Sequence, residues 1–244
     1  MIVYILVLIP AALIGLIAPR LRARFNIWVF RTWARFSLWL FGVRLTVKGT
    51  PPPAPFLLVS NHLSYMDIPV LSSQLDGVFV AKSEIAGWPV AGLACKLVRT
   101  IFVDREMKRD LPRVLVEIND RLAYGQGVIF FPEGTSSGGA EVAPFRPPLM
   151  EAAAQSGHPV HYASLAYRTL PGENPAHLAV CWWRKMTFPD HLFRMACMPG
   201  FEASLAFGGE PVHDHDRKDL ASRLHQEVTR LFEPTTPDPI AEEA

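Results

Sequence analysis

A histidine and an aspartate lie five residues apart in a setting where they could form a general base. His62 and Asp67 belong to the stretch SNHLSYMD, which follows the short apolar run FLLV. Five residues of regular helix would turn the two side chains about 140° apart. A loop between the end of a strand and the start of a helix can instead fold the carboxylate back onto the imidazole. Such an aspartate fixes the tautomer and raises the basicity of the other ring nitrogen, so the pair is a candidate general base.

A second candidate is the stretch FPEGTSSGG at residues 131–139, which continues from the apolar run VIF. Sites in α/β proteins lie at the ends of strands, and Glu133 at such an end could accept hydrogen bonds from substrate hydroxyls. The glycines allow the backbone to approach a ligand closely. The same letters contain G-T-S-S-G, a match to the serine hydrolase pattern G-x-S-x-G, which makes Ser136 a candidate nucleophile. An ordinary polar turn is the alternative to both roles.

Two arginines are candidates for binding an anion. Arg105 follows Asp104 at the end of the apolar run TIFV, and Arg146 stands in the stretch VAPFRPP, just before a predicted helix. A guanidinium suits bidentate capture of an anionic group. The simpler alternatives are a surface salt bridge at Arg105 and plain solvation at Arg146, so spacing alone assigns neither residue.

These candidates stand at the ends of apolar runs that alternate with helical patterns. We expect strands at residues 56–60, 77–81, 100–104 and 128–131, and further strands over PVHYASLAYR, HLAVCWW and FEASLAFG. We expect helices from about residue 67, over 106–125, over 146–156 and over 214–232. This alternation predicts an α/β fold, with a mixed sheet flanked by helices. Asp216 is the predicted N-cap of the last helix, and residues 234–244 are expected to form a disordered tail.

The N-terminal segment is predicted to be a membrane anchor. Residues 1–19 carry no charge and are almost long enough to cross the hydrocarbon core of a bilayer, although their length leaves open whether they span or only embed. A secretory signal is the competing interpretation, but basic residues follow the apolar run and none precede it. The arginines after the segment place the rest of the chain on the cytoplasmic side. We therefore expect N-terminal membrane-anchoring helices at residues 1–42 of an inner-membrane protein, followed by a catalytic domain at residues 43–233.

The stretch after the first segment has the pattern of an interfacial helix. At about 100° per residue, its arginines fall within one narrow sector: Arg20, Arg24, Arg31 and Arg35. Apolar side chains gather on the opposite side: Phe25, Val29, Trp33, Phe36 and Leu40. Arginines opposite aromatic residues are typical of helices that lie in a membrane surface. The alternative is a helix that packs on the protein core and exposes its polar face.

Composition limits the partners and cofactors. Half of the 244 residues are apolar, 19% are charged and the net charge is +1, so overall charge indicates no nucleic-acid partner and we expect none. Three cysteines without a C-x-x-C pair argue against a disulfide framework or a zinc site, and they fit a reducing compartment. The stretch HDHD at residues 213–216 has no further ligand nearby, so it is interpreted as a helix cap. No metal is therefore expected.

The candidate segments occur in the order N-H-x-x-x-x-D, F-V-D-R, F-P-E-G-T and P-F-R, each after a predicted strand or before a predicted helix. This series, over about residues 40–170, resembles the glycerolipid acyltransferase family, which includes the bacterial 1-acyl-sn-glycerol-3-phosphate acyltransferases. The resemblance implies a membrane-bound acyltransferase of lipid biosynthesis. It would transfer a fatty acyl group from an acyl-carrier-protein or coenzyme A thioester to the hydroxyl of a membrane lysolipid. No further cofactor is implied.

The resemblance also implies a role for each motif. His62 would take the proton from the acceptor hydroxyl and Asp67 would orient the imidazole, so that the hydroxyl attacks the thioester without an acyl-enzyme intermediate. Arg105 would bind the anionic head group. The motifs imply five more substrate-binding residues: Asn61, Glu133, Gly134, Thr135 and Arg146.

The sequence departs from the family at Ser136. Enzymes with a phosphate acceptor usually read F-P-E-G-T-R-S, whereas this chain has serine in place of that arginine. The loss of one cation argues against a phosphate monoester, which carries nearly two negative charges. FPEGTSS, together with VAKSEIAGWPVAGL upstream, is more similar to the branch of lyso-ornithine lipid acyltransferases, which acylate the hydroxyl of a 3-hydroxy fatty amide. Both acceptors, 1-acylglycerol-3-phosphate and lyso-ornithine lipid, stay open.

Two other functions compete with acyl transfer. A lipid esterase would use Ser136 as its nucleophile, but a nucleophile elbow needs a strand, a sharp turn, the serine and then a helix. Pro132-Glu133-Gly134 separate Ser136 from the predicted strand, and the GGAEVAP that follows soon after is a poor helix former. A non-catalytic membrane-tethering module would leave the pairing of His62 with Asp67 unexplained.

Overall fold

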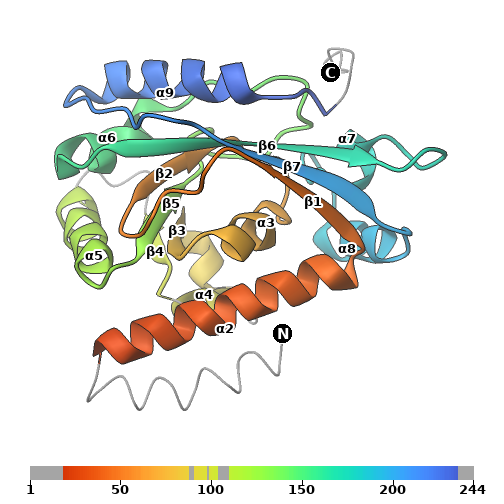
Figure 1. Ribbon diagram of the computed structural model, residues 1–244, viewed down its shortest axis with the longest axis horizontal. Helices are drawn as coiled ribbons and strands as arrows, with labels where there is room; N and C mark the ends of the chain where they lie inside the picture. The colour runs from red at the N-terminus through yellow and green to blue at the C-terminus, as the bar shows by residue number, and fades with distance from the viewer. Residues whose placement is uncertain (1–18, 88–90, 98, 104–109, 236–244) are drawn as a thin grey trace.

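A single seven-stranded sheet forms the centre of the computed structural model, which describes residues 19–87, 91–97, 99–103 and 110–235 (Figure 1). Its strand order is β1-β7-β6-β2-β5-β3-β4. The strands are β1 (Val43–Lys48), β2 (Leu57–Ser60), β3 (Gly77–Lys82), β4 (Ile101–Val103), β5 (Gly127–Phe130), β6 (Val160–Thr169) and β7 (Phe201–Phe207). The five strands from β6 to β4 are parallel, whereas β7 is antiparallel to β6 and β1 is parallel to β7. The predicted α/β fold with a mixed sheet is confirmed.

Helices cover both faces of the sheet (Figure 1). The face on which α9 lies is covered by α5 (Leu111–Ala123), α6 (Pro147–Ser156) and α9 (Arg217–Leu231). The opposite face is covered by α2 (Pro19–Leu40), α3 (Asp67–Gln74), α7 (Ala176–Ala179) and α8 (Phe188–Ala196). A 3-10 helix, η1 (Ser83–Gly87), and α4 (Ala91–Leu97) lie between β3 and β4 in the chain.

Two hydrophobic cores result, one on each face, because successive side chains of a strand point in opposite directions. In β2, Leu57 and Val59 pack with the α5, α6 and α9 side, while Leu58 packs with the α3 side. Both neighbours of β2 are parallel strands, and all four of its residues are buried. Burial on both faces explains why this strand is a continuous apolar run rather than an alternating one.

Most predicted strands are present within a residue or two of their bounds, but the strand predicted over HLAVCWW is wrong. This stretch begins as the short helix α7 and continues as an irregular segment. Its backbone finds partners in the loop after β2: the Trp182 N–H donates to Leu63 O (2.9 Å), and Ser64 Oγ donates to Val180 O (2.7 Å). Because the loop satisfies these groups, the segment does not join the sheet. The edge strand β1 was not predicted.

The helix-cap interpretation of HDHD is confirmed. The Asp216 side chain accepts hydrogen bonds from the N–H groups of Lys218 (2.7 Å) and Asp219 (3.1 Å) at the start of α9. The neighbouring Asp214 forms an ion pair with Arg223 (3.1 Å). Within the described ranges, no group of three or more His, Cys, Asp or Glu side chains is placed to hold a metal ion.

Helix α2 is amphipathic, as predicted, but its faces are divided differently. Its inner face packs against α3 and buries Asn26, Val29, Ala34 and Leu38. Arg31, predicted to lie with the other arginines on a polar face, turns to the protein, pairs with Asp76 (3.1 Å) and donates to Gln74 O (2.8 Å).

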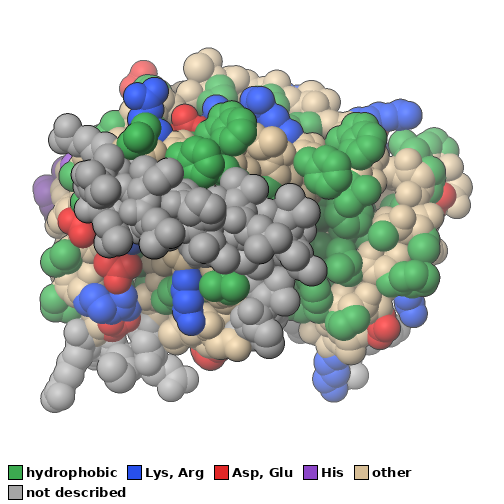
Figure 2. Space-filling view, turned by 90° about the horizontal axis from the view of Figure 1, so that it is seen from below, with side chains coloured by type: hydrophobic (Ala, Val, Ile, Leu, Met, Phe, Trp, Pro, Cys, Tyr) green, Lys and Arg blue, Asp and Glu red, His purple; other side chains and the backbone are tan. Residues whose placement is uncertain are grey.

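The outward side of α2 carries six large hydrophobic residues, which we call the α2 outer face: Leu21, Phe25, Trp28, Phe36, Trp39 and Leu40. Trp28 is 62% exposed and Trp39 is 73% exposed. Arg24 and Arg35 are exposed on the same helix. Figure 2, which views the molecule from below, shows hydrophobic and basic side chains side by side on this surface. The predicted separation of arginines from aromatic residues is therefore wrong, and both kinds of residue share the outer side.

No helix in the part of the chain that the structure describes combines the length and apolar character needed to cross a bilayer. Of the segment considered for a membrane anchor, residues 1–18 lie outside the described residues, so that expectation stays a prediction. Residues 236–244 of the predicted tail also lie outside them.

Candidate active site

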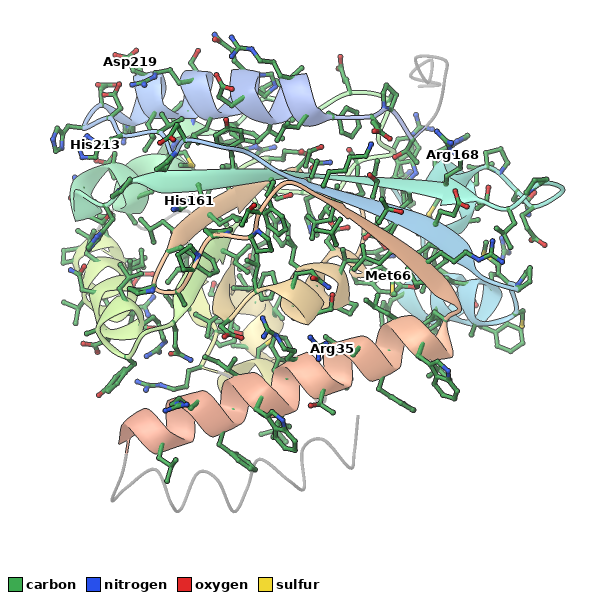
Figure 3. All side chains as sticks on the ribbon, viewed as in Figure 1. Arg35, Met66, His161, Arg168, His213 and Asp219 are labelled. Carbon is green, nitrogen blue, oxygen red and sulfur yellow. The ribbon has the colours of Figure 1, made fainter. Side chains whose placement is uncertain are left out.

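His62 and Asp67 meet where β2 gives way to α3. The strand ends at Ser60, the helix begins at Asp67, and the Asp67 N–H donates to Ser64 O (3.1 Å) as the loop turns into the helix. This turn brings His62 Nδ1 to 2.6 Å from Asp67 Oδ2. The preceding residue, Met66, is labelled in Figure 3 and marks the turn on the α3 side of the sheet. The predicted contact is present, at the carboxyl end of a parallel strand, where α/β folds place their sites.

The Asp67 carboxylate is fully buried and has hydrogen-bond donors on both oxygens. Oδ2 accepts from the N–H groups of Leu63 (2.7 Å) and Ser64 (3.1 Å) as well as contacting His62 Nδ1. Oδ1 accepts from the hydroxyl of Tyr167 (2.7 Å). The described contacts therefore hold both carboxylate oxygens of Asp67 in place beside the imidazole.

The His62 ring is held on one edge and one face. Asp67 occupies Nδ1, and Phe131 stacks on the ring with centroids 4.2 Å apart and an interplanar angle of 16°. The side chain is 23% exposed. None of the described residues forms a hydrogen bond with Nε2, so this nitrogen is the one left for a substrate hydroxyl. The predicted role of His62 as a general base stays a prediction.

Glu133 lies against the backbone of the same histidine. Its Oε1 accepts from the His62 N–H (3.1 Å), and no described residue bonds its buried Oε2. Burial raises the pKa of Glu133 to about 9; the His62 N–H opposes this rise and the Asp67 charge adds to it. Glu133 is therefore neutral at pH 7. Its predicted contact with substrate hydroxyls stays a prediction, since the contact that the structure shows is with His62.

The turn after β5 ties the two motifs together. Gly134 has φ of +82°, a left-handed conformation that glycine adopts without strain. Further along, the Ser137 N–H donates to His62 O (3.0 Å). The Ser136 hydroxyl donates to Trp182 O. The chain then remains irregular until α6 begins at Pro147, so Ser136 lacks the helix that a nucleophile elbow needs.

A cleft of about 940 Å³ opens beside this site. Phe131 and Glu133, which both contact His62, line it, whereas His62 and Asp67 do not, and the exposed Thr135 lies on its wall. Most of its lining is apolar and comes from β3, β4, α5, β5 and α6; examples are Val80, Val103, Val114, Phe130, Phe145 and Leu149. A cleft with this lining suits a fatty acyl chain, because it removes the chain from water.

Arg146 and Arg217 are the described arginines that line the cleft. Arg217 forms an ion pair with Glu151. Arg146 is exposed, its N–H donates to Pro132 O (2.9 Å), and it forms no ion pair with any described carboxylate. The predicted anion-binding residue Arg105 lies outside the described residues. Arg146 thus lines the cleft, and its predicted role in binding an anion stays a prediction.

Asn61 is positioned by the sheet rather than by the cleft. Its side chain is buried, its Nδ2 donates to Leu165 O (2.9 Å) and its Oδ1 accepts from the Leu165 N–H (2.7 Å). Both ends of the amide therefore bind the backbone of β6 and hold the start of the loop between β2 and α3 against that strand. Its predicted contact with substrate stays a prediction.

Sequence reasoning missed the residues that support the dyad from a distance. Tyr167 lies 100 residues after Asp67, and the segment around Trp182 packs on the loop that contains Leu63. The spacing of residues within a short motif does not predict contacts between such distant positions. The one available signal was general: a tyrosine in a buried strand needs a partner for its hydroxyl.

Comparisons with known proteins agree with this geometry. Residues 43–165 match the model of the acyltransferase family. The lyso-ornithine lipid O-acyltransferase of Rhizobium meliloti is 39% identical over 218 residues, which cover 84% of this chain and 75% of that protein. The 1-acyl-sn-glycerol-3-phosphate acyltransferase of Neisseria gonorrhoeae is 33% identical over 174 residues, which cover 70% of this chain and 67% of that protein.

A solved structure shares the fold. The crystal structure of the 1-acyl-sn-glycerophosphate acyltransferase of Thermotoga maritima matches with a TM-score of 0.60 at 23% identity, over 86% of this chain and 81% of that one. Together, the family match over half of the sequence and the identity to characterised relatives show that this chain is an acyltransferase enzyme and belongs to the acyltransferase family.

Proposed function

We propose that the enzyme transfers a fatty acyl group from an acyl-carrier-protein or coenzyme A thioester to the hydroxyl of a membrane lysolipid. The observation that carries this proposal is the contact between His62 Nδ1 and Asp67 Oδ2 at 2.6 Å, together with an apolar cleft of about 940 Å³ whose lining residues Phe131 and Glu133 both contact His62. A general base next to a chain-sized apolar cleft is what direct acylation of a lipid hydroxyl requires.

In the proposed reaction, His62 Nε2 takes the proton of the acceptor hydroxyl as its oxygen attacks the thioester carbonyl carbon. A C–O bond forms, and the tetrahedral intermediate collapses with loss of the C–S bond. The leaving thiolate then takes the proton from the imidazolium. Asp67 holds Nδ1–H and stabilises the imidazolium charge. No acyl-enzyme is formed, so no side chain acts as a nucleophile.

For the acceptor, we propose lyso-ornithine lipid, with 1-acylglycerol-3-phosphate as the alternative. Ser136 stands where phosphate-acceptor enzymes usually have arginine, and its hydroxyl is turned to Trp182 O. Among the described residues, Arg146 is the one cleft-lining arginine outside an ion pair. A site with one cation fewer than the phosphate-acceptor enzymes matches the single carboxylate of an N-acylated ornithine better than a phosphate monoester with nearly two negative charges. Several relatives, including one from Brucella abortus, are lyso-ornithine lipid O-acyltransferases, which supports this choice.

We further propose that the enzyme works at the cytoplasmic surface of the inner membrane. The α2 outer face presents aromatic residues together with Arg24 and Arg35, a combination that favours the interface between lipid head groups and acyl chains. A lipid acceptor would reach the cleft from the same membrane. The sidedness rests on the arginines that follow the first apolar segment.

The deciding experiment offers purified protein both thioesters and both acceptors in mixed micelles. We expect transfer to lyso-ornithine lipid, with a loss of about 10²–10⁴-fold in the His62→Ala variant because the hydroxyl loses its base. The matched control is His158→Ala, which changes an exposed histidine on the connection between α6 and β6. Full activity of His62→Ala would refute the mechanism. Transfer to the phosphate acceptor alone would refute the proposed acceptor.

A further inference from the structure

Tyr167 on β6 reaches the dyad from the middle of the sheet. Its hydroxyl donates to Asp67 Oδ1 at 2.7 Å, although the two residues are 100 positions apart in the sequence. The side chain is only 2% exposed, and its ring packs edge-on against Phe201 with centroids 5.7 Å apart. It does not line the cleft. Tyr167 therefore contacts the aspartate and not the substrate.

Among the described residues, the Tyr167 hydroxyl is the one donor to Asp67 Oδ1. Oδ2 has three partners, His62 Nδ1 and the N–H groups of Leu63 and Ser64, whereas Oδ1 has Tyr167. The loop donors and the histidine all move with residues 62–67. Tyr167 comes instead from β6, where it pairs with Ala203 of the neighbouring strand β7. Its bond therefore fixes the carboxylate relative to the sheet.

We propose that Tyr167 is a positioning residue for the acyl transfer: its hydroxyl holds the Asp67 carboxylate in the orientation that presents Oδ2 to His62, and it limits how strongly that carboxylate holds the imidazolium. This inference rests on the proposed function of His62 as the general base. Nothing in the local motif H-x-x-x-x-D contains this third member.

Loss of the Tyr167 hydroxyl should shift the pH at which His62 becomes available as a base upward. A hydrogen bond from Tyr167 withdraws charge from Asp67. Without it, the carboxylate holds the protonated imidazole more tightly, so a higher pH is needed to free the base. The other titratable groups that face the pair are Glu133, from the turn after β5, and Cys181, from the segment after α7. Glu133 is neutral near pH 7, and burial raises the pKa of Cys181 well above its usual value, so neither group titrates in the same range.

The test compares Tyr167→Phe with Tyr162→Phe. Both tyrosines lie on β6 and both donate to a carboxylate, but Tyr162 donates to Glu227 Oε2 (3.3 Å) on the other face of the sheet. For Tyr167→Phe we expect kcat to fall about tenfold, with the KM for the acceptor unchanged. We also expect the acid limb of the kcat profile to move up by about half a pH unit or more. Tyr162→Phe should leave both quantities unchanged.

Three outcomes would overturn the proposal. The first is a Tyr167→Phe enzyme with wild-type kcat and pH profile. The second is a loss of kcat with an unmoved acid limb, which would mean a purely structural role. If Tyr167→Phe does not fold, 3-fluorotyrosine in place of Tyr167 keeps the shape of the side chain and gives a stronger hydrogen-bond donor. The acid limb of the kcat profile should then move to lower pH. The third outcome that would overturn the proposal is an acid limb that does not move in this variant. Activity in His62→Ala would instead refute the proposed function, so the two failures are distinguishable.

Discussion

Replacing Glu133 by glutamine removes a buried acid while keeping its shape and its bond to the catalytic loop. The amide oxygen of Gln can still accept the His62 N–H that Oε1 accepts at 3.1 Å. The variant has no carboxyl group that can titrate at this position. The pKa of Glu133 rises from 4.5 to about 9 on folding, chiefly because the carboxyl is buried. The variant therefore isolates the free energy of keeping this acid protonated.

The magnitude follows from linkage between protonation and folding. Because the pKa is raised in the folded state, the stabilising contribution is complete below pH 4.5 and is lost as the pH rises toward 9. Each unit is worth about 1.4 kcal/mol, so at pH 7 the folded chain has lost about 3 kcal/mol relative to acid conditions. Glu133→Gln has no such loss. It should be more stable than wild type by up to about 3 kcal/mol at pH 7, and the difference should shrink toward pH 5.

The assay is urea unfolding of the detergent-solubilised protein at several values between pH 5 and pH 9. The control is Glu173→Gln, which removes an exposed carboxyl in the connection after β6. Activity provides a second readout: a neutral amide should preserve kcat within about tenfold, because the acid it replaces is already neutral. Wild-type and Glu133→Gln stability curves that run parallel from pH 5 to pH 9 would refute the reasoning.

The other predictions address the base, the head group, the nucleophile and the membrane. Asp67→Asn should lower kcat by about 10²–10⁴-fold, because the amide does not stabilise the imidazolium; unchanged kcat would remove Asp67 from the mechanism. Arg146→Ala should raise the KM for the acceptor about tenfold or more, with little change in kcat, if it binds the head group. Ser136→Ala should keep most of the activity. A fluorophosphonate should not label the wild-type enzyme at Ser136. Trp39→Ser, on the α2 outer face, should weaken binding to anionic vesicles about tenfold. The control Val116→Ser changes an exposed apolar residue on α5 and should not weaken this binding.

The dyad was predictable because its geometry is local. His62 and Asp67 are separated by one turn of loop, and the end of a buried strand fixes where that loop starts. The apolar runs that mark β2 and β5 are strong signals, since parallel central strands are buried on both faces. These two facts place the H-x-x-x-x-D and F-P-E-G-T motifs each at the end of a strand, whereas the pairing of β2 with β5 that brings them together was not predicted.

The supporting contacts were not predictable, because they join residues that are far apart in the sequence. The carbonyl groups of Val180 and Trp182 accept from side chains of the two motif loops, and Tyr167 comes from another strand. HLAVCWW looked like a strand because it is apolar and contains bulky residues, yet tertiary hydrogen bonds overrode that propensity. The faces of α2 were also decided by its packing on α3, which helical spacing alone does not reveal.

Two buried carboxyl groups flank His62, and they differ in the number of hydrogen-bond donors around each one. Asp67 receives hydrogen bonds from two backbone N–H groups and the Tyr167 hydroxyl, and it contacts the imidazole. Glu133 receives one backbone N–H, and the Asp67 charge opposes its ionisation. A second anion at this distance would compete for the imidazolium and would bury an uncompensated charge. In the proposed mechanism, the carboxylate that stabilises the imidazolium lies on the side of Nδ1, opposite the Nε2 atom that takes the proton of the hydroxyl.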